Sequence, residues 1–140
     1  TKYLLPHLKL TRGQMVVISS VSGVAPMPHR QAYCSSKYAV TGFFDSLRMD
    51  VGDKVAITMC NPSTFTGSNF RQNGIGRGDA PPSIKGDKSL TVEQCAEVCV
   101  AAADRRVRSV VMPGKVYFVS ALHPMMPTWV EPIIKRGAKL

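Results

Sequence analysis

A tyrosine and a lysine four residues apart form the most distinctive pair of reactive side chains in the sequence. They are Tyr33 and Lys37, at the start of a stretch whose apolar period is helical. Residues four apart on a helix lie on one face, one turn apart. A free phenol has a pKa of about 10, and a nearby ammonium favours the phenolate. The pair can therefore move a proton on or off an alcohol oxygen.

Ser20 stands thirteen residues before Tyr33. It comes directly after a run that is typical of a buried parallel strand. The run covers residues 14–19, and its apolar centre, Met15–Ile18, is rich in β-branched residues, which favours a strand between two helix layers. Doubly wound proteins bind their ligands at the carboxyl ends of such strands. Ser20 at this end can donate a hydrogen bond to a carbonyl oxygen. Ser19 and Ser22 are competitors, with loop capping as their alternative role, and the spacing favours Ser20.

The elements around these residues alternate between strand and helix. The pattern predicts a helix tail over residues 2–10, the strand 14–19, a loop over 20–30, a helix from 33 to about 50, and a strand over 55–60. Gly13 and Gly52 follow the two helices, as glycine commonly does. Strand, helix and strand at this spacing form a βαβ unit.

The second half of the chain is less regular. Residues 61–90 hold five glycines and three prolines, which predicts a lid, a binding loop or a disordered segment. A capping-box pattern at residues 91–94 predicts a helix to about residue 106. Residues 109–112 and 116–122 are predicted as short strands, or as a strand and an apolar edge. The tail from His123 is rich in proline and apolar residues, and we expect residues 125–134 to pack over the substrate cleft or, less favoured, to rest on a membrane interface.

This order predicts the α/β class: a Rossmann-like doubly wound parallel sheet, of which the chain supplies the C-terminal half. We expect residues 1–140 to form a single partial domain, because neither a linker nor a repeat interrupts them. The composition, 44% hydrophobic and 19% charged, is that of a globular chain.

Charge and metal ligands narrow the possible partners. The net charge is +9, but the basic residues are spread along the sequence without an aromatic-interleaved stripe. We therefore expect a solvated basic surface and no nucleic-acid partner. The three histidines have no metal-ligand spacing, so no metal site is predicted. Four cysteines without a CxxC pair predict free, buried thiols and a reducing compartment. We expect an intracellular protein.

Taken together, residues 17–23, 33–40, 42–44 and 47–48 resemble the short-chain dehydrogenase/reductase family, and in particular its hydroxysteroid-dehydrogenase-like members. The resemblance runs from about Leu4 to Pro62 and is weaker from Thr91 onward. It implies an oxidoreductase that transfers a hydride between a nicotinamide cofactor, NADP or NAD with NADP preferred, and an alcohol or carbonyl substrate of lipophilic character.

The resemblance also implies the roles of individual residues. Tyr33 would exchange the proton, Lys37 would lower its pKa and hold the nicotinamide ribose, and Ser20 would steady the substrate oxygen. The loop after the second predicted strand would contact the cofactor through Pro62, Ser63 and Phe65. The family usually has a glycine where this chain has Ser63, and a threonine where it has Gly67. Those loop contacts therefore depart from the family pattern.

The family's glycine-rich phosphate turn would lie upstream, and no G-x-G-x-x-G stands at a strand–helix boundary here. We therefore expect this chain alone to bind cofactor poorly and to be inactive, the enzyme being a longer parent protein that is a homo-oligomer. One alternative is a truncated, non-catalytic dimerisation or interaction module that uses the helix 33–50. Another is a sugar-nucleotide epimerase or dehydratase relative, which shares YxxxK.

The last three residues, 138–140, resemble the Ser-Lys-Leu address of peroxisomal proteins. The peroxisome is thus one predicted location, and the cytoplasm or the surface of the endoplasmic reticulum membrane is the alternative.

Overall fold

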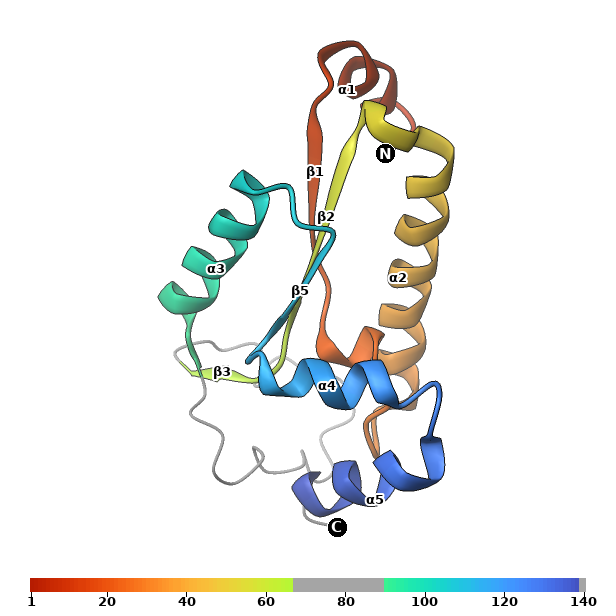
Figure 1. Ribbon diagram of the computed structural model, residues 1–140, viewed down its shortest axis with the longest axis vertical. Helices are drawn as coiled ribbons and strands as arrows, with labels where there is room; N and C mark the ends of the chain where they lie inside the picture. Colours follow the sequence, from red (N-terminus) through yellow and green to blue (C-terminus); the bar gives the residue numbers. More distant parts are fainter. Residues whose placement is uncertain (67–89, 139–140) are drawn as a thin grey trace.

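The computed structural model describes residues 1–66 and 90–138. Its centre is a parallel sheet of three strands in the order β1-β2-β5, with α2 on one face and α3 on the other (Figure 1). The strands are β1 (Gln14–Ile18), β2 (Ala56–Pro62) and β5 (Ser109–Met112). Parallel strands joined through helices define the predicted α/β class, which the structure confirms.

The remaining elements surround this sheet. The helices are α1 (Leu5–Thr11), α2 (Gln31–Val51), α3 (Val92–Asp104), α4 (Lys115–Leu122) and α5 (Pro127–Ala138). Two 3₁₀ turns, η1 (Val21–Gly23) and η2 (Gly52–Lys54), and a small parallel pair, β3 (Phe65–Thr66) with β4 (Leu90–Thr91), complete the described part. Most of the predicted loop 61–90 lies outside the described residues.

The predicted helix boundaries follow from local chemistry. Gly52 ends α2 with a positive φ of 56°, a conformation that costs glycine little. At the start of α3, the Thr91 hydroxyl accepts from the Gln94 amide, while the Gln94 side chain accepts from the Thr91 amide. This reciprocal pair is the capping box that the sequence predicted.

The face of the sheet toward α2 is the better buried. Val51, Val55 and Ile57 form a buried cluster there, with partly buried apolar side chains from α1, α2 and β1 packed against it. On the other face of β1, Val16 and Ile18 are 42% and 57% exposed. The expectation that β1 is covered on both faces is therefore wrong within the described residues, because α3 packs more against β2, β4 and β5 than against β1.

One predicted strand is a helix. Residues 116–122 were expected to be a strand or an apolar edge, but they belong to α4. A short apolar run does not distinguish a buried strand from a helix by its period. Here the Ser120 hydroxyl donates to the carbonyl of Tyr117 within the helix, and α4 packs across the carboxyl edge of the sheet (Figure 1).

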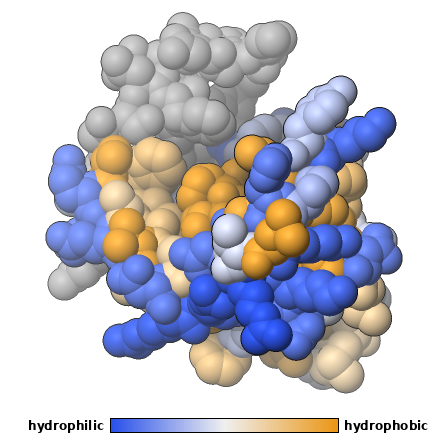
Figure 2. All heavy atoms as spheres, turned by 90° about the horizontal axis from the view of Figure 1, so that it is seen from above, coloured by the Kyte–Doolittle hydropathy of each residue, from blue (hydrophilic) through white to orange (hydrophobic). Residues whose placement is uncertain are grey.

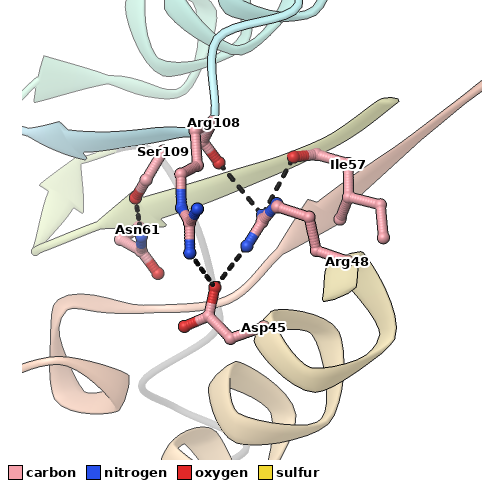
Figure 3. Close-up of polar contacts among 6 residues, drawn as sticks. All are labelled: Asp45, Arg48, Ile57, Asn61, Arg108 and Ser109. Atoms are coloured by element: carbon pink, nitrogen blue, oxygen red, sulfur yellow. Dashed lines mark hydrogen bonds and ion pairs between the residues drawn. The ribbon is translucent and has the colours of Figure 1, made fainter. Parts of the chain in front are cut away.

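A polar network fastens α2 to the strands. The Arg48 side chain, 14% exposed, forms an ion pair with Asp45 and donates to the carbonyls of Ile57 at 3.0 Å and Arg108 at 3.3 Å (Figure 3). β5 begins opposite Met59. The Ile57 carbonyl therefore lies before the start of the ladder, and Arg48 supplies the donor that a strand would otherwise provide.

The end of the molecule at α1 is largely hydrophilic, with hydrophobic patches between the polar side chains (Figure 2). Among the described residues, ion pairs join only Asp45 to Arg48 and to Arg108. Most of the described basic side chains are thus available to solvent.

Candidate active site

Ser20 lies where β1 ends, at the carboxyl edge of the sheet, and is the N-cap of η1. Its hydroxyl oxygen accepts from the Ser22 amide at 3.1 Å, and its hydroxyl donates to the Pro62 carbonyl at 3.5 Å. The side chain is 8% exposed. Ser20 thus joins the ends of two neighbouring strands, and its long bond to Pro62 is weak enough for the hydroxyl to turn toward another acceptor.

Tyr33 and Lys37 occupy the first two turns of α2, which begins at the same edge of the sheet (Figure 1). The Lys37 Nζ lies 5.8 Å from the centroid of the Tyr33 ring. This is within the range of a cation–π contact. Both side chains are half-buried. The predicted pairing of an ammonium with a phenol is therefore present in the geometry of this helix.

Close packing of η1 against α2 brings Gly23, three residues after Ser20, next to the turn of α2 that holds Lys37. A Cβ at Gly23 would lie 2.8 Å from the Lys37 carbonyl oxygen and 2.9 Å from the Thr41 Oγ1. The Thr41 hydroxyl in turn donates to the same Lys37 carbonyl at 3.2 Å. Only glycine fits this approach, and sequence reasoning did not single Gly23 out as a positioning residue.

We expect Gly23→Ala to destabilise the fold by about 1–3 kcal/mol, because the added methyl meets backbone that cannot move aside cheaply. Gly42→Ala is the matched control: a Cβ there meets nothing within 4 Å, and alanine is the better helix former by about 0.5–1 kcal/mol. Urea unfolding of both variants measures the difference. Equal stability of Gly23→Ala and the unsubstituted chain would contradict the close packing.

The predicted cofactor loop starts beside Ser20. Pro62 is the last residue of β2, and the Ser63 amide donates to the Met112 carbonyl at 2.7 Å. Phe65 lies in β3 and is half-buried. The structure therefore brings Pro62 and Ser63 to the edge that holds Ser20, while Phe65 begins the next element. Gly67, which stands at the family's threonine position, lies outside the described residues.

Interactions between thiols link β2 to α3, which the separation of Cys60 from Cys99 in the sequence did not predict. The buried Cys60 and the Cys95 thiol both interact with Cys99. Burial, assisted by Cys60, raises the pKa of Cys99 to about 11. A thiol with such a pKa is scarcely ionised at neutral pH, so we assign this group to packing. All four cysteines are free, as predicted, and Cys60 is buried, but the expected burial is wrong for Cys34, Cys95 and Cys99, which are half-buried.

A shallow hollow of about 450 Å³ lies between α2, β5 and α4, next to the candidate site. Tyr38, Thr41, Tyr117 and Ser120 are among its lining residues, whereas Ser20, Tyr33 and Lys37 are not. Burial, and secondarily Cys34, raises the pKa of Tyr38. Tyr38 is thus a poorer proton shuttle than its position beside Lys37 would suggest, and it offers a control for Tyr33.

Within residues 1–66 and 90–138, no group of three His, Cys, Asp or Glu side chains lies close enough to hold a metal ion. The chemistry available at the carboxyl edge is therefore that of a phenol, an ammonium and a hydroxyl on a Rossmann-like scaffold. This set suits proton transfer at an alcohol or carbonyl oxygen.

Comparison with known proteins defines the family. Residues 1–75 match the family described as short chain dehydrogenase. The chain is 34% identical over 146 aligned residues to dehydrogenase/reductase SDR family member 7B of Xenopus laevis, covering 99% of this chain and 45% of that protein. It is 30% identical to 11-beta-hydroxysteroid dehydrogenase A of Arachis hypogaea, covering 92% of this chain and 40% of that protein. The chain therefore belongs to the short-chain dehydrogenase family of oxidoreductases.

A solved structure supports the same fold. A short-chain dehydrogenase from Streptomyces avermitilis superposes with a TM-score of 0.59 at 16% identity, over 100% of this chain and 58% of the other. The predicted Rossmann-like architecture and the family resemblance are thus confirmed. The chain spans less than half the length of these two curated relatives.

Proposed function

We propose that the protein containing this chain interconverts a secondary alcohol and its ketone, or a primary alcohol and its aldehyde, with a nicotinamide dinucleotide. The observation that supports this most directly is the Lys37 ammonium 5.8 Å from the Tyr33 ring, on the helix against which the Ser20 segment packs. Membership of an oxidoreductase family supports the reaction class.

Each of the three side chains has one role in this proposal. Tyr33 donates a proton to the carbonyl oxygen during reduction and accepts it from the alcohol during oxidation. The Lys37 ammonium stabilises the phenolate that forms when Tyr33 gives up its proton. Ser20 turns its hydroxyl from the Pro62 carbonyl to the substrate oxygen and polarises it, which stabilises the charge that develops there.

The donor set at this edge fits the nicotinamide riboside end of the cofactor, which supplies or accepts the hydride when bound. Lys37 and Tyr33 offer hydrogen-bond donors for ribose hydroxyls. Pro62, Ser63 and Phe65 would form the wall beside the cofactor, and the Ser63 amide is already committed to the Met112 carbonyl. We propose that the cofactor is NADP or NAD, with NADP preferred.

We propose that residues 1–140 are the catalytic half of a single Rossmann-type domain whose other half grips the pyrophosphate. The free edge of β1 and its exposed Val16 and Ile18 support this, since a further strand and helix would cover them. The chain also covers less than half of the length of two relatives, as half of a domain would. We further propose that the parent protein is a homo-oligomer, to which the exposed Phe43 and Met49 of α2 offer apolar contact area.

A lipophilic alcohol or ketone is the proposed substrate class. The relative from Arachis hypogaea is named as a hydroxysteroid dehydrogenase. The tail after His123 would help to shape the pocket, and residues 67–89 of the loop that we expected to do the same lie outside the described residues. Four free thiols support a reducing, intracellular compartment. Two of the three residues of the predicted peroxisomal address, 139 and 140, lie outside the described residues. Among the residues that the structure describes, no helix is long and apolar enough to cross a membrane.

The test is turnover by the parent protein with NADPH and with NADH, offered steroid ketones, short aliphatic ketones and a nucleotide-sugar. We expect ketone reduction, faster with NADPH and with the lipophilic substrates. Turnover of the nucleotide-sugar alone would establish the epimerase or dehydratase alternative. A parent that binds neither cofactor while still self-associating would be an interaction module and would contradict the proposal.

A further inference from the structure

The hollow between α2, β5 and α4 is lined only by uncharged residues within the described part of the chain. It measures about 450 Å³, a size at which protein cavities take up small molecules. The sequence holds 18 basic and 9 acidic residues, so a wall without any of them differs from the rest of the surface. Moving a charged group from water to such a wall without a partner is unfavourable. The lining therefore favours an uncharged ligand.

Three hydroxyls in this lining keep hydrogen-bonding capacity. The Ser109 oxygen accepts from the buried Asn61 amide at 3.1 Å, so its own proton remains available to another acceptor (Figure 3). Thr41 and Ser120 donate their protons to carbonyls of their own helices, at 3.2 Å and 2.9 Å, so their oxygens can still accept. These three side chains thus offer a ligand both a donor and acceptors.

The apolar part of the lining has room for a ring. Val111 of β5 and Pro124, which follows α4, supply apolar surface, and Tyr117 of α4 supplies an exposed aromatic ring. A Cβ at Gly42 would meet nothing within 4 Å, so the wall formed by α2 is open at this residue. Aromatic rings pack on one another edge to face or offset, and gain more than their buried area alone provides. A ligand with a ring therefore suits this part of the hollow.

The hollow is separate from the candidate active site, but it adjoins the turn that carries Lys37. Ser20, Tyr33 and Lys37 do not line it. Gly23 and Thr41 do line it, and both lie against the Lys37 carbonyl. The hollow also lies beside β5, whereas the other half of the proposed domain would join the sheet at β1, its opposite edge. A ligand in the hollow would therefore contact the support of Lys37 without entering the active site.

The tail of the chain does not fill the hollow. Pro124 is the last described residue that lines it. Met126, Trp129 and Ile133 of the following helix are 46%, 74% and 58% exposed. The expectation that residues 125–134 pack over the substrate cleft is therefore wrong for these three side chains, and the described part of the tail leaves the hollow open.

We propose that this hollow binds a small uncharged ligand that carries a ring and a hydroxyl group, at a site separate from the active site. The ligand hydroxyl accepts from Ser109 and donates to Thr41 or Ser120, which it can do at once because it has one proton and two lone pairs. The ring packs against Tyr117 and fills the space beside Gly42. This binding is independent of the proposed dehydrogenase activity.

Three compounds with one ring system test the proposal on the 140-residue chain: beta-naphthol, naphthalene and beta-naphthoate. Amide correlation spectra of the isotope-labelled chain measure affinity and location together. We expect naphthol to shift the amides of Gly42, Ser109 and Ala121 and to saturate them with one Kd. Naphthalene should bind about two- to tenfold more weakly for each hydrogen bond that it cannot form. Naphthoate should bind more weakly than naphthol, although the net charge of +9 attracts anions in general.

Two variants separate the space for the ring from the hydrogen bond. Gly42→Leu fills the open part of the α2 wall and is expected to weaken naphthol binding about tenfold or more. Ser109→Ala removes the proposed donor and is expected to weaken naphthol binding about two- to tenfold while naphthalene binding stays the same. Ser46→Leu and Ser46→Ala are the matched controls, because Ser46 is exposed, lies one turn after Gly42 and does not line the hollow. Circular dichroism verifies that all variants fold.

Four outcomes would overturn the proposal. The first is that none of the three compounds gives a saturable shift. The second is that naphthoate binds as tightly as naphthol, which would indicate general attraction of a basic chain for anions. The third is an equal loss of naphthol and naphthalene binding in Ser109→Ala, or a loss as large in the Ser46 variants. The fourth is a shift of the same amides on raising the protein concentration without ligand, which would identify a second copy as the occupant.

Discussion

Replacing Tyr33 with phenylalanine is expected to lower kcat of the parent protein by about 10²- to 10⁴-fold, the usual contribution of a positioned general acid or base. The substitution removes one oxygen and leaves the ring on which Lys37 lies. Cofactor affinity should fall far less than kcat, because the variant loses one proposed donor to the ribose and keeps Lys37. Steady-state turnover together with cofactor titration by fluorescence measures both quantities in one preparation.

Tyr38→Phe is the matched control for this prediction. Tyr38 lies on the same helix, directly after Lys37, but burial raises the pKa of its phenol, and it faces the hollow toward α4. We expect its loss to leave kcat within a few fold. If Tyr33→Phe kept the unsubstituted rate, or if Tyr38→Phe lost as much, Tyr33 would not be the proton shuttle.

Lys37→Met provides a second arm of the same experiment. Without the ammonium, the phenolate that forms when Tyr33 gives up its proton loses its electrostatic support, so kcat for ketone reduction should fall even at saturating cofactor. A Lys37→Met variant that raised only the KM for the cofactor would restrict Lys37 to cofactor binding.

The parts of this fold that the sequence predicts well are those that local chemistry determines. Residues 14–18 form a strand because a β-branched apolar run cannot be solvated on both faces, and α3 begins at Val92 because Thr91 and Gln94 satisfy the first amides. The Tyr33–Lys37 pair was predictable for the same reason, since a spacing of four on a helix is itself a spatial relation.

The parts that the sequence did not predict depend on contacts between distant residues. Ser20 reaches the Pro62 carbonyl across 42 positions, and the need for glycine at position 23 arises from a carbonyl on another helix. α4 was predicted as a strand because Val116 to Val119 are all apolar, and only packing across the sheet edge decides in favour of a helix. The pairing of β3 with β4 joins two-residue segments that have no period to detect.

The polar network of α2 is the strongest example of such a contact, because nothing in the spacing of Arg48 indicates its partners. Its guanidinium reaches from α2 to the carbonyls of Ile57 and Arg108, which lie just before the first residue pair of the β2–β5 ladder (Figure 3). Asp45 accepts from Arg48 and, at 3.5 Å, from Arg108. One side chain therefore holds together a helix, the central strand and the link into β5.

Arg48→Met is accordingly expected to lower the free energy of unfolding by about 2–3 kcal/mol. Methionine keeps much of the aliphatic stem but leaves the Ile57 carbonyl without a donor, and hydrogen bonds from a charged group are worth about 1.5–3 kcal/mol. Urea unfolding followed by far-ultraviolet circular dichroism measures the change. Lys54→Met, at an exposed site in η2, is the control and should stay within about 0.5 kcal/mol.

Asp45→Asn distinguishes the two kinds of contact that Arg48 makes. The Asp45 side chain is 47% exposed, and ion pairs at such sites contribute only about 0–1 kcal/mol. If the carbonyls are the important partners, Asp45→Asn costs far less than Arg48→Met, and Arg48→Lys, which keeps a charged donor on a shorter side chain, lies between them. If Asp45→Asn destabilised the fold as much as Arg48→Met, the ion pair and not the strand contact would hold α2, and with it Tyr33 and Lys37, in place.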